Sequence, residues 1–225
     1  MSGDPNPFLK PAAVSDYVRE TPLKVPGFAD LHKMATLLLA EHASGAAEVL
    51  VVGAGGGLEI RAMAEMRPDW RFTGVDPSPA MLDIARQTTA LWAERTHLLH
   101  GTAVDAPAGP FDGAVCLLTL HFLEWRERLE TLREIQKRLK PGGVFVAAHH
   151  TGIDEQADLW LERSATFARG LNLAPGQAAA SAKAMAERLS LLSPFREEAC
   201  FREAGFQQPS MFYGAFSFRG WVMTA

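Results

Sequence analysis

The sequence predicts an α/β protein with a doubly wound, mostly parallel seven-stranded sheet, N-terminal helices, a helical cap insertion and a C-terminal antiparallel hairpin. Between residues 46 and 150, short apolar runs alternate with segments of helical periodicity, which is typical of parallel strands covered by helices on both faces. Residues 210–225 form two further β-type runs joined near Ser217, and this connection is too short for a parallel crossover. These two runs therefore predict the hairpin.

The core elements follow in chain order. Each expected strand is a short apolar run, and each expected helix carries apolar residues at helical spacing. Ser78 and Pro79 mark one helix start, and Pro141 with the two glycines after it marks one helix end. The expected strands cover residues 49–52, 71–75, 97–101, 112–120 and 144–150, and the expected helices cover residues 57–66, 78–92 and 127–143.

The two flanking regions do not continue this alternation. Residues 8–42 have helical periodicity with a break at 25–28, and residues 154–190 have it with a break at 173–176. We expect helices in both regions, although the closure of the sheet does not require them.

The bulk composition indicates an ordinary globular chain. Of its 225 residues, 48% are hydrophobic and 21% are charged, which suffices for a sizeable core. The formal net charge of −4 argues against nucleic acid as a partner and favours a small molecule. No apolar run approaches the roughly 20 residues that span a bilayer, and the start of the chain lacks the features of a signal peptide. The two cysteines have no metal-ligand spacing, so we expect no metal site. From the apolar runs, the start of the chain and the low cysteine content, we also expect no membrane contact and a cytoplasmic location.

A glycine-rich turn follows the first strand. In "VLVVGAGGG" (49–57), Gly53, Gly55 and Gly57 stand between a strand and a helix, where bare backbone N–H groups favour polar or anionic ligand atoms. A dinucleotide fingerprint would need its third glycine where the chain has Leu58, which disfavours a pyrophosphate ligand. A tight turn without any ligand is the alternative interpretation.

Asp76 ends the second expected strand. A carboxylate at this edge of the sheet accepts hydrogen bonds from the 2′- and 3′-hydroxyls of a ribose. The alternative is a cap for the helix that begins near Pro79. Adenosine without a pyrophosphate points to S-adenosylmethionine as the cofactor.

These motifs together resemble the class I S-adenosylmethionine-dependent methyltransferases, which have a Rossmann-like fold. The matching segments within residues 48–150 are "VLVVGAGGG", "FTGVDPSPAMLDIAR", "FDGAVCLLTLHFLE" and "LKPGGVFVAAHH". The segment "REAGFQQPSMFYGAFSFRGWVMTA" looks like the final helix and hairpin of the family. In addition, "VPGF", "TLHFLE" and "REAGF" resemble the branch that contains carboxy-S-adenosylmethionine synthase, a tRNA-modification enzyme.

The resemblance implies one methyltransferase domain over residues 1–225 with S-adenosyl-L-methionine as its cofactor. Its parts are a helical lid (1–45), a cofactor-binding core (46–150), a helical cap (151–192) and a final helix with the hairpin (193–225). The residues expected to contact the cofactor are Gly53, Ala54, Gly55, Gly57, Asp76, Pro77, Met81, Thr102, Ala103, Leu117 and Thr119. Tyr17 and Arg19 are expected to cover the methionine part of the cofactor, with plain surface packing as the alternative.

The chain departs from the family pattern at several positions. Val51 stands where the family usually has an acidic residue that helps to order the methionine end of the cofactor. Thr102 stands where a carboxylate often accepts from the adenine amino group, so we assign the adenine contact to residues 102–105. In the branch that contains carboxy-S-adenosylmethionine synthase, an arginine should bind the extra carboxylate of the cofactor. This chain offers only Lys183 and Arg188 in its place, so we do not expect carboxy-S-adenosylmethionine synthesis.

Three histidines are candidates for catalysis. His121, His149 and His150 come at the carboxyl ends of the fourth and fifth strands, where each would face the pocket as a general base or a substrate ligand. A structural role is the alternative for each of them.

The acceptor is expected to be small and apolar or aromatic. The cap and the hairpin carry large apolar side chains, many of which also suit the core: Trp160, Phe167, Leu171, Leu173, Met185, Phe212, Tyr213, Phe216, Phe218 and Trp221. The sequence thus predicts methyl transfer to O or N of such an acceptor by a monomer or homodimer. The alternatives are a cofactor-binding regulatory protein without catalysis and a tRNA-modification enzyme related to carboxy-S-adenosylmethionine synthase.

Overall fold

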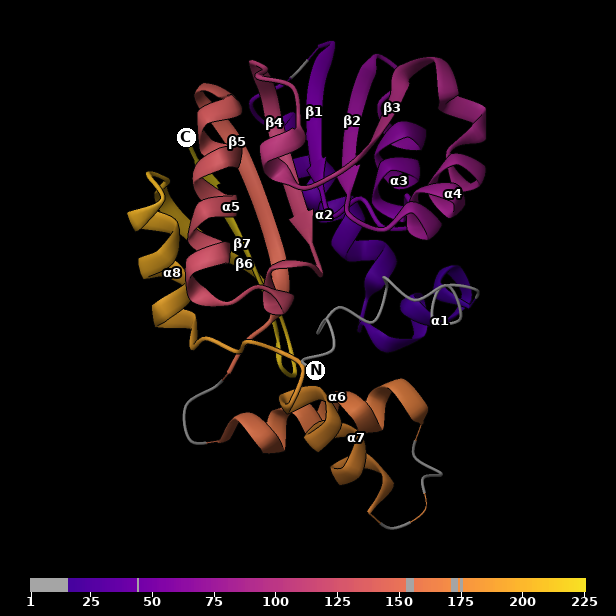
Figure 1. Cartoon of the computed structure of the whole chain (residues 1–225), viewed down its shortest axis with the longest axis vertical. Helices are drawn as coiled ribbons and strands as arrows, with labels where there is room; N and C mark the ends of the chain where they lie inside the picture. The colour runs from indigo at the N-terminus through magenta and orange to yellow at the C-terminus, as the bar shows by residue number, and fades with distance from the viewer. Residues whose placement is uncertain (1–15, 44, 153–155, 171–173, 175) are drawn as a thin grey trace.

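The computed structural model describes residues 16–43, 45–152, 156–170, 174 and 176–225. Its strands are β1 (Ala47–Val52), β2 (Trp70–Asp76), β3 (Thr96–His100), β4 (Phe111–Leu117), β5 (Leu139–His150), β6 (Gln207–Ala215) and β7 (Phe218–Thr224). These described strands form one seven-stranded sheet in the order β3-β2-β1-β4-β5-β7-β6 (Figure 1). β1 to β5 run parallel, and β7 pairs antiparallel with both β5 and β6. The predicted fold class is confirmed.

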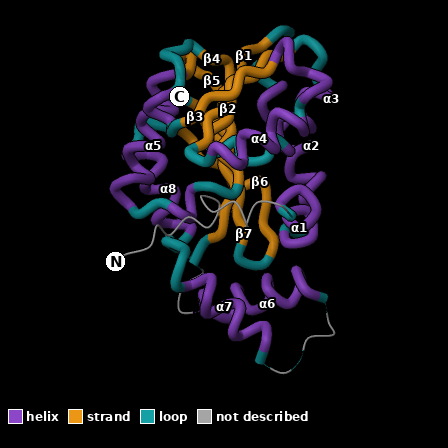
Figure 2. The backbone as a smooth tube through the Cα atoms, turned by 45° about the vertical axis from the view of Figure 1, so that its right-hand side comes forward, coloured by secondary structure: helices purple, strands orange, loops and turns teal. Residues whose placement is uncertain are grey.

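Helices cover both faces of the sheet. The α-helices of the described residues are α1 (Tyr17–Lys24), α2 (Phe28–Ala40), α3 (Leu58–Met66), α4 (Pro79–Thr88), α5 (Trp125–Arg138), α6 (Ala157–Arg169), α7 (Gln177–Ala186) and α8 (Pro194–Glu203). On one face, α2 and α3 enclose a core with Val49 and Val51, and on the other, α5 and α8 enclose a core with Leu50 and Val52 (Figure 2). Residues 49–52 of β1 are therefore all buried, which explains the unbroken apolar run in the sequence.

Several boundaries differ from the expected ones. α4 ends at Thr88 rather than at residue 92, and the 3₁₀ turn Ala90–Arg95 follows it. β4 ends at Leu117 rather than at residue 120, because Leu118 leaves the extended region with a φ of +58°. A short 3₁₀ turn, Leu120–Phe122, follows and carries His121 beyond the strand. α5 ends at Arg138 rather than at residue 143, because residues 139–143 already belong to β5.

Of the flanking helices, α1, α6 and α7 lie toward the carboxyl ends of the parallel strands, whereas α2 packs on a face of the sheet. α1 and α2 are separated at residues 25–27, close to the expected break. α6 and α7 lie at the lower end of the molecule in Figure 1, and α1 contacts α6. Leu171 and Leu173 of the expected cap surface lie outside the described residues. The division of the chain into lid, core and cap remains a prediction.

Two kinds of feature are absent from the described part of the chain. No helix there is both long and apolar enough to cross a membrane. No cluster of three or more His, Cys, Asp or Glu side chains in the same residues is arranged to hold a metal ion.

Candidate active site

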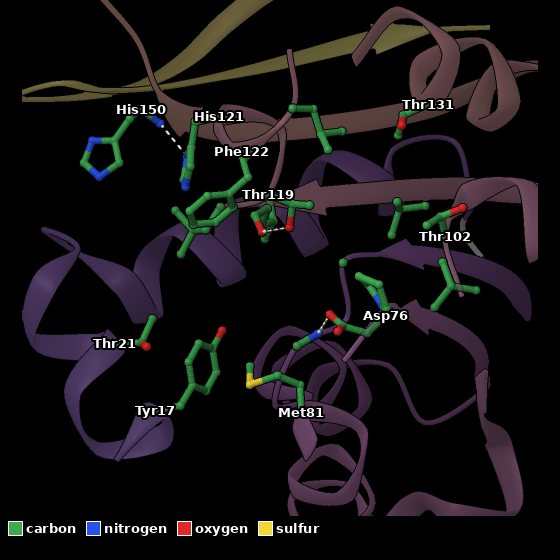
Figure 3. A pocket seen from close by; sticks show the side chains of 18 of the residues that line it. Tyr17, Thr21, Asp76, Met81, Thr102, Thr119, His121, Phe122, Thr131 and His150 are labelled. Atoms are coloured by element: carbon green, nitrogen blue, oxygen red, sulfur yellow. Dashed lines mark hydrogen bonds between the residues drawn. The ribbon is translucent and has the colours of Figure 1, made fainter. Parts of the chain in front are cut away.

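A cavity of about 290 Å³ opens at the carboxyl ends of β1, β2, β4 and β5, and α1 forms one of its walls (Figure 3). Many of the expected site residues line it: Tyr17, Gly53, Gly55, Asp76, Pro77, Met81, Thr102, Ala103, Leu117, Thr119, His121 and His150. They come from segments far apart in the sequence. The parallel sheet gathers them because its strands end at the same edge.

Three other expected site residues do not line the cavity. Ala54 is fully buried in the core, and Gly57 begins α3 in a left-handed conformation with a φ of +75°, so both support the glycine turn from behind. The Arg19 side chain is 73% exposed and pairs with Asp16 at 2.8 Å. Because Arg19 is only two residues from Tyr17, the two side chains lie on different faces of α1. We therefore no longer assign Arg19 to the cofactor.

His149 also lies elsewhere, because successive residues of a strand point to opposite faces and His150 is the one that reaches the cavity. The fully buried His149 ring has its Nε2 2.9 Å from Oε1 of Glu197, which also pairs with the buried Arg128. Burial alone would raise the pKa of the Glu197 carboxyl, but His149 and Arg128 lower it below its usual value. The assignment of His149 as a catalytic residue is thus corrected: it belongs to a buried ionic cluster between β5, α5 and α8.

Packing explains part of the glycine turn. A Cβ on Gly53, whose φ is +72°, would lie 2.2 Å from Oγ1 of Thr119. A Cβ on Gly56 would lie 2.8 Å from Cδ1 of Tyr17. The missing side chains therefore make room for two residues of the cavity wall, and they also leave the backbone of Gly53 and Gly55 bare toward the cavity.

Asp76 holds the turn and the start of α4 together. Its Oδ2 accepts from the backbone N–H of Gly55 at 2.8 Å (Figure 3), and its Oδ1 accepts from that of Ser78 at 2.8 Å. Burial raises the pKa of this carboxyl, while the two backbone donors oppose that shift. Each carboxylate oxygen has room for a further hydrogen bond, so the capping role and a ribose-binding role are compatible.

A second buried carboxyl, Glu59, lies nearby and was not singled out from the sequence. It stands in the first turn of α3, is 5% exposed, and has a pKa raised to about 8 by burial and, to a lesser extent, by Asp76. Burial also raises the pKa of the Tyr17 hydroxyl, with Glu59 and Asp76 adding to the effect. The only signal for Glu59 in the sequence was that an acidic residue stands two positions after Gly57, the last glycine of the turn.

His121 has a defined hydrogen-bond partner. The backbone N–H of His150 donates to its Nδ1 at 3.1 Å (Figure 3). Burial, followed by the neighbouring His150, His149 and Arg128, lowers the pKa of His121 well below its usual value. The ring is therefore neutral.

His150 belongs to a hydrogen-bond chain with two serines that were not expected from the sequence. Its Nδ1 lies 2.7 Å from Oγ of Ser217 at the hairpin turn, and Ser217 lies 2.7 Å from Oγ of Ser164 on α6. The His150 ring stacks on Phe218 with ring centroids 3.8 Å apart. Burial, and then His149, lowers the pKa of His150 to about 3.

Arg128 connects the buried ionic cluster to the cavity wall. Its guanidinium donates to the carbonyl oxygens of Leu123 and Ser190, and the Ser190 N–H donates to the carbonyl oxygen of His121 at 2.8 Å. The 3₁₀ turn that carries His121 is thus held from behind.

A family model described as a methyltransferase domain matches residues 50–145. Its match, the seven-stranded sheet with a final antiparallel hairpin, and the cavity at the carboxyl edge agree with one another. The chain is similar to the class I S-adenosylmethionine-dependent methyltransferases, and S-adenosylmethionine is the cofactor of that class.

Among curated proteins, the chain is similar to carboxy-S-adenosyl-L-methionine synthases. That of Campylobacter fetus subsp. fetus is 27% identical over 122 residues, which cover 54% of this chain and 52% of that protein. That of Chromohalobacter salexigens is 31% identical over 164 residues, which cover 70% and 60%. The chain thus spans about half the length of the first curated relatives that it matches.

Solved structures share the fold. A putative O-methyltransferase from Nostoc punctiforme PCC 73102 superposes with a TM-score of 0.69 at 19% identity, covering 94% of this chain and 59% of that one. The N-methyltransferase NodS from Bradyrhizobium japonicum WM9, in complex with S-adenosyl-L-homocysteine, gives a TM-score of 0.60 at 18% identity, covering 87% and 85%.

Proposed function

We propose that the protein transfers the methyl group of S-adenosylmethionine to an oxygen or nitrogen of a small apolar or aromatic acceptor. One observation carries this proposal: a single cavity has a polar part lined by Gly55 and Asp76 and a part lined by His121, Phe122 and Phe218. The first part suits a nucleoside, and the second suits an apolar acceptor with one polar contact.

The residues of the polar part fit the cofactor. The Asp76 carboxylate has acceptor capacity left for two ribose hydroxyls, and Gly53 and Gly55 present bare backbone. Thr102 and Ala103 line the cavity beyond β3, which supports the adenine assignment. The sulfonium supplies an activated methyl group when bound, so the protein has to align the acceptor and exclude water.

Calorimetry with S-adenosylhomocysteine tests the cofactor site. We expect binding by the unmodified chain, and a loss of about tenfold to hundredfold in Asp76→Asn, since a hydrogen bond to a charged group contributes about 1.5–3 kcal/mol. Asp83→Asn is the matched control, because this exposed carboxylate pairs only with Arg86 on the same helix among the described residues. Binding of a nicotinamide or flavin with no response to S-adenosylhomocysteine would refute the proposal.

Turnover distinguishes the alternatives. Formation of S-adenosylhomocysteine with a panel of small aromatic acceptors is expected for a methyltransferase, whereas a regulatory protein of this fold binds the cofactor without turnover. The names of the curated relatives raise carboxy-S-adenosylmethionine synthesis as another function. Lys183 and Arg188 are exposed and do not line the cavity, so neither stand-in supports that chemistry.

A further inference from the structure

We infer that His121 is a fixed neutral hydrogen-bond donor rather than a base, and that the methyl acceptor is an ionised oxygen, a carboxylate or an acidic phenol, on an aromatic or apolar body. This inference rests on the function proposed above and narrows it. It follows from the proton positions at one ring, the chemistry of the other groups in the cavity, and the number of lone pairs on the acceptor atom.

The proton position on His121 is set by its backbone partner. An amide N–H can only donate, so the Nδ1 that receives the His150 N–H at 3.1 Å must carry a lone pair. The single proton of the neutral ring is then on Nε2. In Figure 3 the second nitrogen of the labelled His121 ring lies on the cavity side, and no hydrogen bond to it comes from the described residues. The cavity therefore receives a donor from His121.

No lining group of the described chain is suited to remove a proton next to this donor. His150 is stacked on an aromatic ring and has a pKa of about 3. Glu20 is paired with Lys24 at 2.7 Å, which lowers its pKa. The Tyr17 hydroxyl keeps its own proton because burial raises its pKa, and the Asp76 carboxylate lies in the polar part of the cavity, where its remaining acceptor capacity is assigned to the ribose.

An acceptor in such a cavity has to arrive with its reactive atom already unprotonated. A neutral hydroxyl would need a base to release its proton, and none is positioned there among the described residues. A neutral amine has a single lone pair, and the His121 N–H would occupy the pair that has to attack. An ionised oxygen has several lone pairs, so one accepts from His121 while another attacks the methyl carbon.

Methyl transfer to an ionised oxygen needs no proton transfer. A bond forms between the ionised oxygen and the methyl carbon, the carbon–sulfur bond breaks, and its electron pair goes to sulfur. The products are a methyl ester or an aryl methyl ether and the neutral thioether S-adenosylhomocysteine. Phe122 and Phe218 in the cavity wall offer the apolar surface for the body of the acceptor.

Nitrogen NMR tests the proton position independently of turnover. We expect long-range proton–nitrogen correlations of the labelled chain with S-adenosylhomocysteine to show His121 protonated at Nε2, with no titration between about pH 5.5 and about pH 8.5. The signal is assigned by its loss in His121→Gln. The charged and titratable groups around the ring are His149, His150 and Arg128, and all of them oppose a second proton. A proton on Nδ1, or an inflection within this range, would overturn the inference.

Ligand binding tests the acceptor class. With S-adenosylhomocysteine present, benzoate and 4-nitrophenolate are expected to bind about tenfold to hundredfold more weakly to His121→Phe than to the unmodified chain, since a charge-assisted hydrogen bond is lost. His121→Gln keeps an N–H donor and should retain much of the affinity, and His97→Gln, an exposed position on β3, should behave as the unmodified chain. Benzyl alcohol and benzylamine lack the negative charge, so they should lose less affinity than the two anions in His121→Phe. Equal anion affinity in His121→Phe would overturn the donor assignment.

The pH dependence of methyl transfer separates acceptor ionisation from an enzyme base. Across phenols of graded acidity, the inflection in kcat/KM is expected to follow the pKa of each phenol. An inflection that stays at one pH for every phenol, or faster transfer to benzylamine than to benzoate and the phenols, would contradict the inference. Failure of S-adenosylhomocysteine to bind would instead refute the proposed function, on which the acceptor class depends.

Discussion

Replacing Glu59 with glutamine is expected to stabilise the protein, and more at alkaline than at acidic pH. The folded chain keeps the Glu59 proton up to about pH 8, whereas the carboxyl in the unfolded chain releases it near its usual 4.5. The unfolded state therefore binds fewer protons in this window, so the free energy of unfolding falls as the pH rises from about 4.5 to about 8. At 1.36 kcal/mol per pH unit, the full effect is on the order of 5 kcal/mol, of which about 3 kcal/mol is present at pH 7.

Glutamine has the shape of the protonated carboxyl and does not titrate, so Glu59→Gln removes this dependence. Urea unfolding followed by circular dichroism should give nearly equal stabilities for the two proteins at about pH 5 and a higher one for the variant at about pH 8. Glu94→Gln, at an exposed position in the 3₁₀ turn Ala90–Arg95, is the control and should follow the unmodified chain. A difference that does not widen with pH, or a variant that is less stable at the alkaline end, would refute the reasoning.

Two further predictions concern packing around the cavity. Gly53→Ala would strain a backbone at φ +72° and place a Cβ 2.2 Å from Thr119, so thermal unfolding should show a loss of at least about 2 kcal/mol, and Thr119→Ala in the same chain should restore only part of it. Arg128→Met would leave the buried Glu197 carboxylate without its cation and should cost about 3–5 kcal/mol in urea unfolding. The double variant Arg128→Met/Glu197→Met should lose less, and an equal or larger loss would contradict the account of this pair.

The sheet was predictable from the sequence because its central strands β1, β2, β4 and β5 carry runs buried on both faces and its turns carry glycine or proline. The edge of the sheet then followed from the rule that parallel strands present their carboxyl ends together. The end of β4 was not predictable in this way. "CLLTL" is apolar throughout, and only the φ of Leu118, which depends on tertiary packing, shows that the strand stops before His121.

Two of the predicted site residues that do not line the cavity also run against periodicities that the sequence already contains. His149 and His150 are adjacent in a strand, so they point to opposite faces and only one of them can reach the cavity. Tyr17 and Arg19 are two residues apart in a helix, so they do not share a face. The hydrogen bonds from His150 to Ser217 and from Ser217 to Ser164 could not have been predicted from periodicity, because they join three segments whose proximity only the folded chain reveals.

The glycine run is weaker evidence for a ligand than its length suggests. Gly53 and Gly56 make room for Thr119 and Tyr17, so a structural reason exists for two of the glycines without any cofactor. The cavity in front of the turn is the stronger evidence for a ligand. A buried Asp76 carboxylate with acceptor capacity left over, beside bare backbone and opposite an apolar wall, needs polar partners that water or a nucleoside can supply. The methyltransferase family model matches residues 50–145, which include this turn, and this match favours S-adenosylmethionine as the nucleoside.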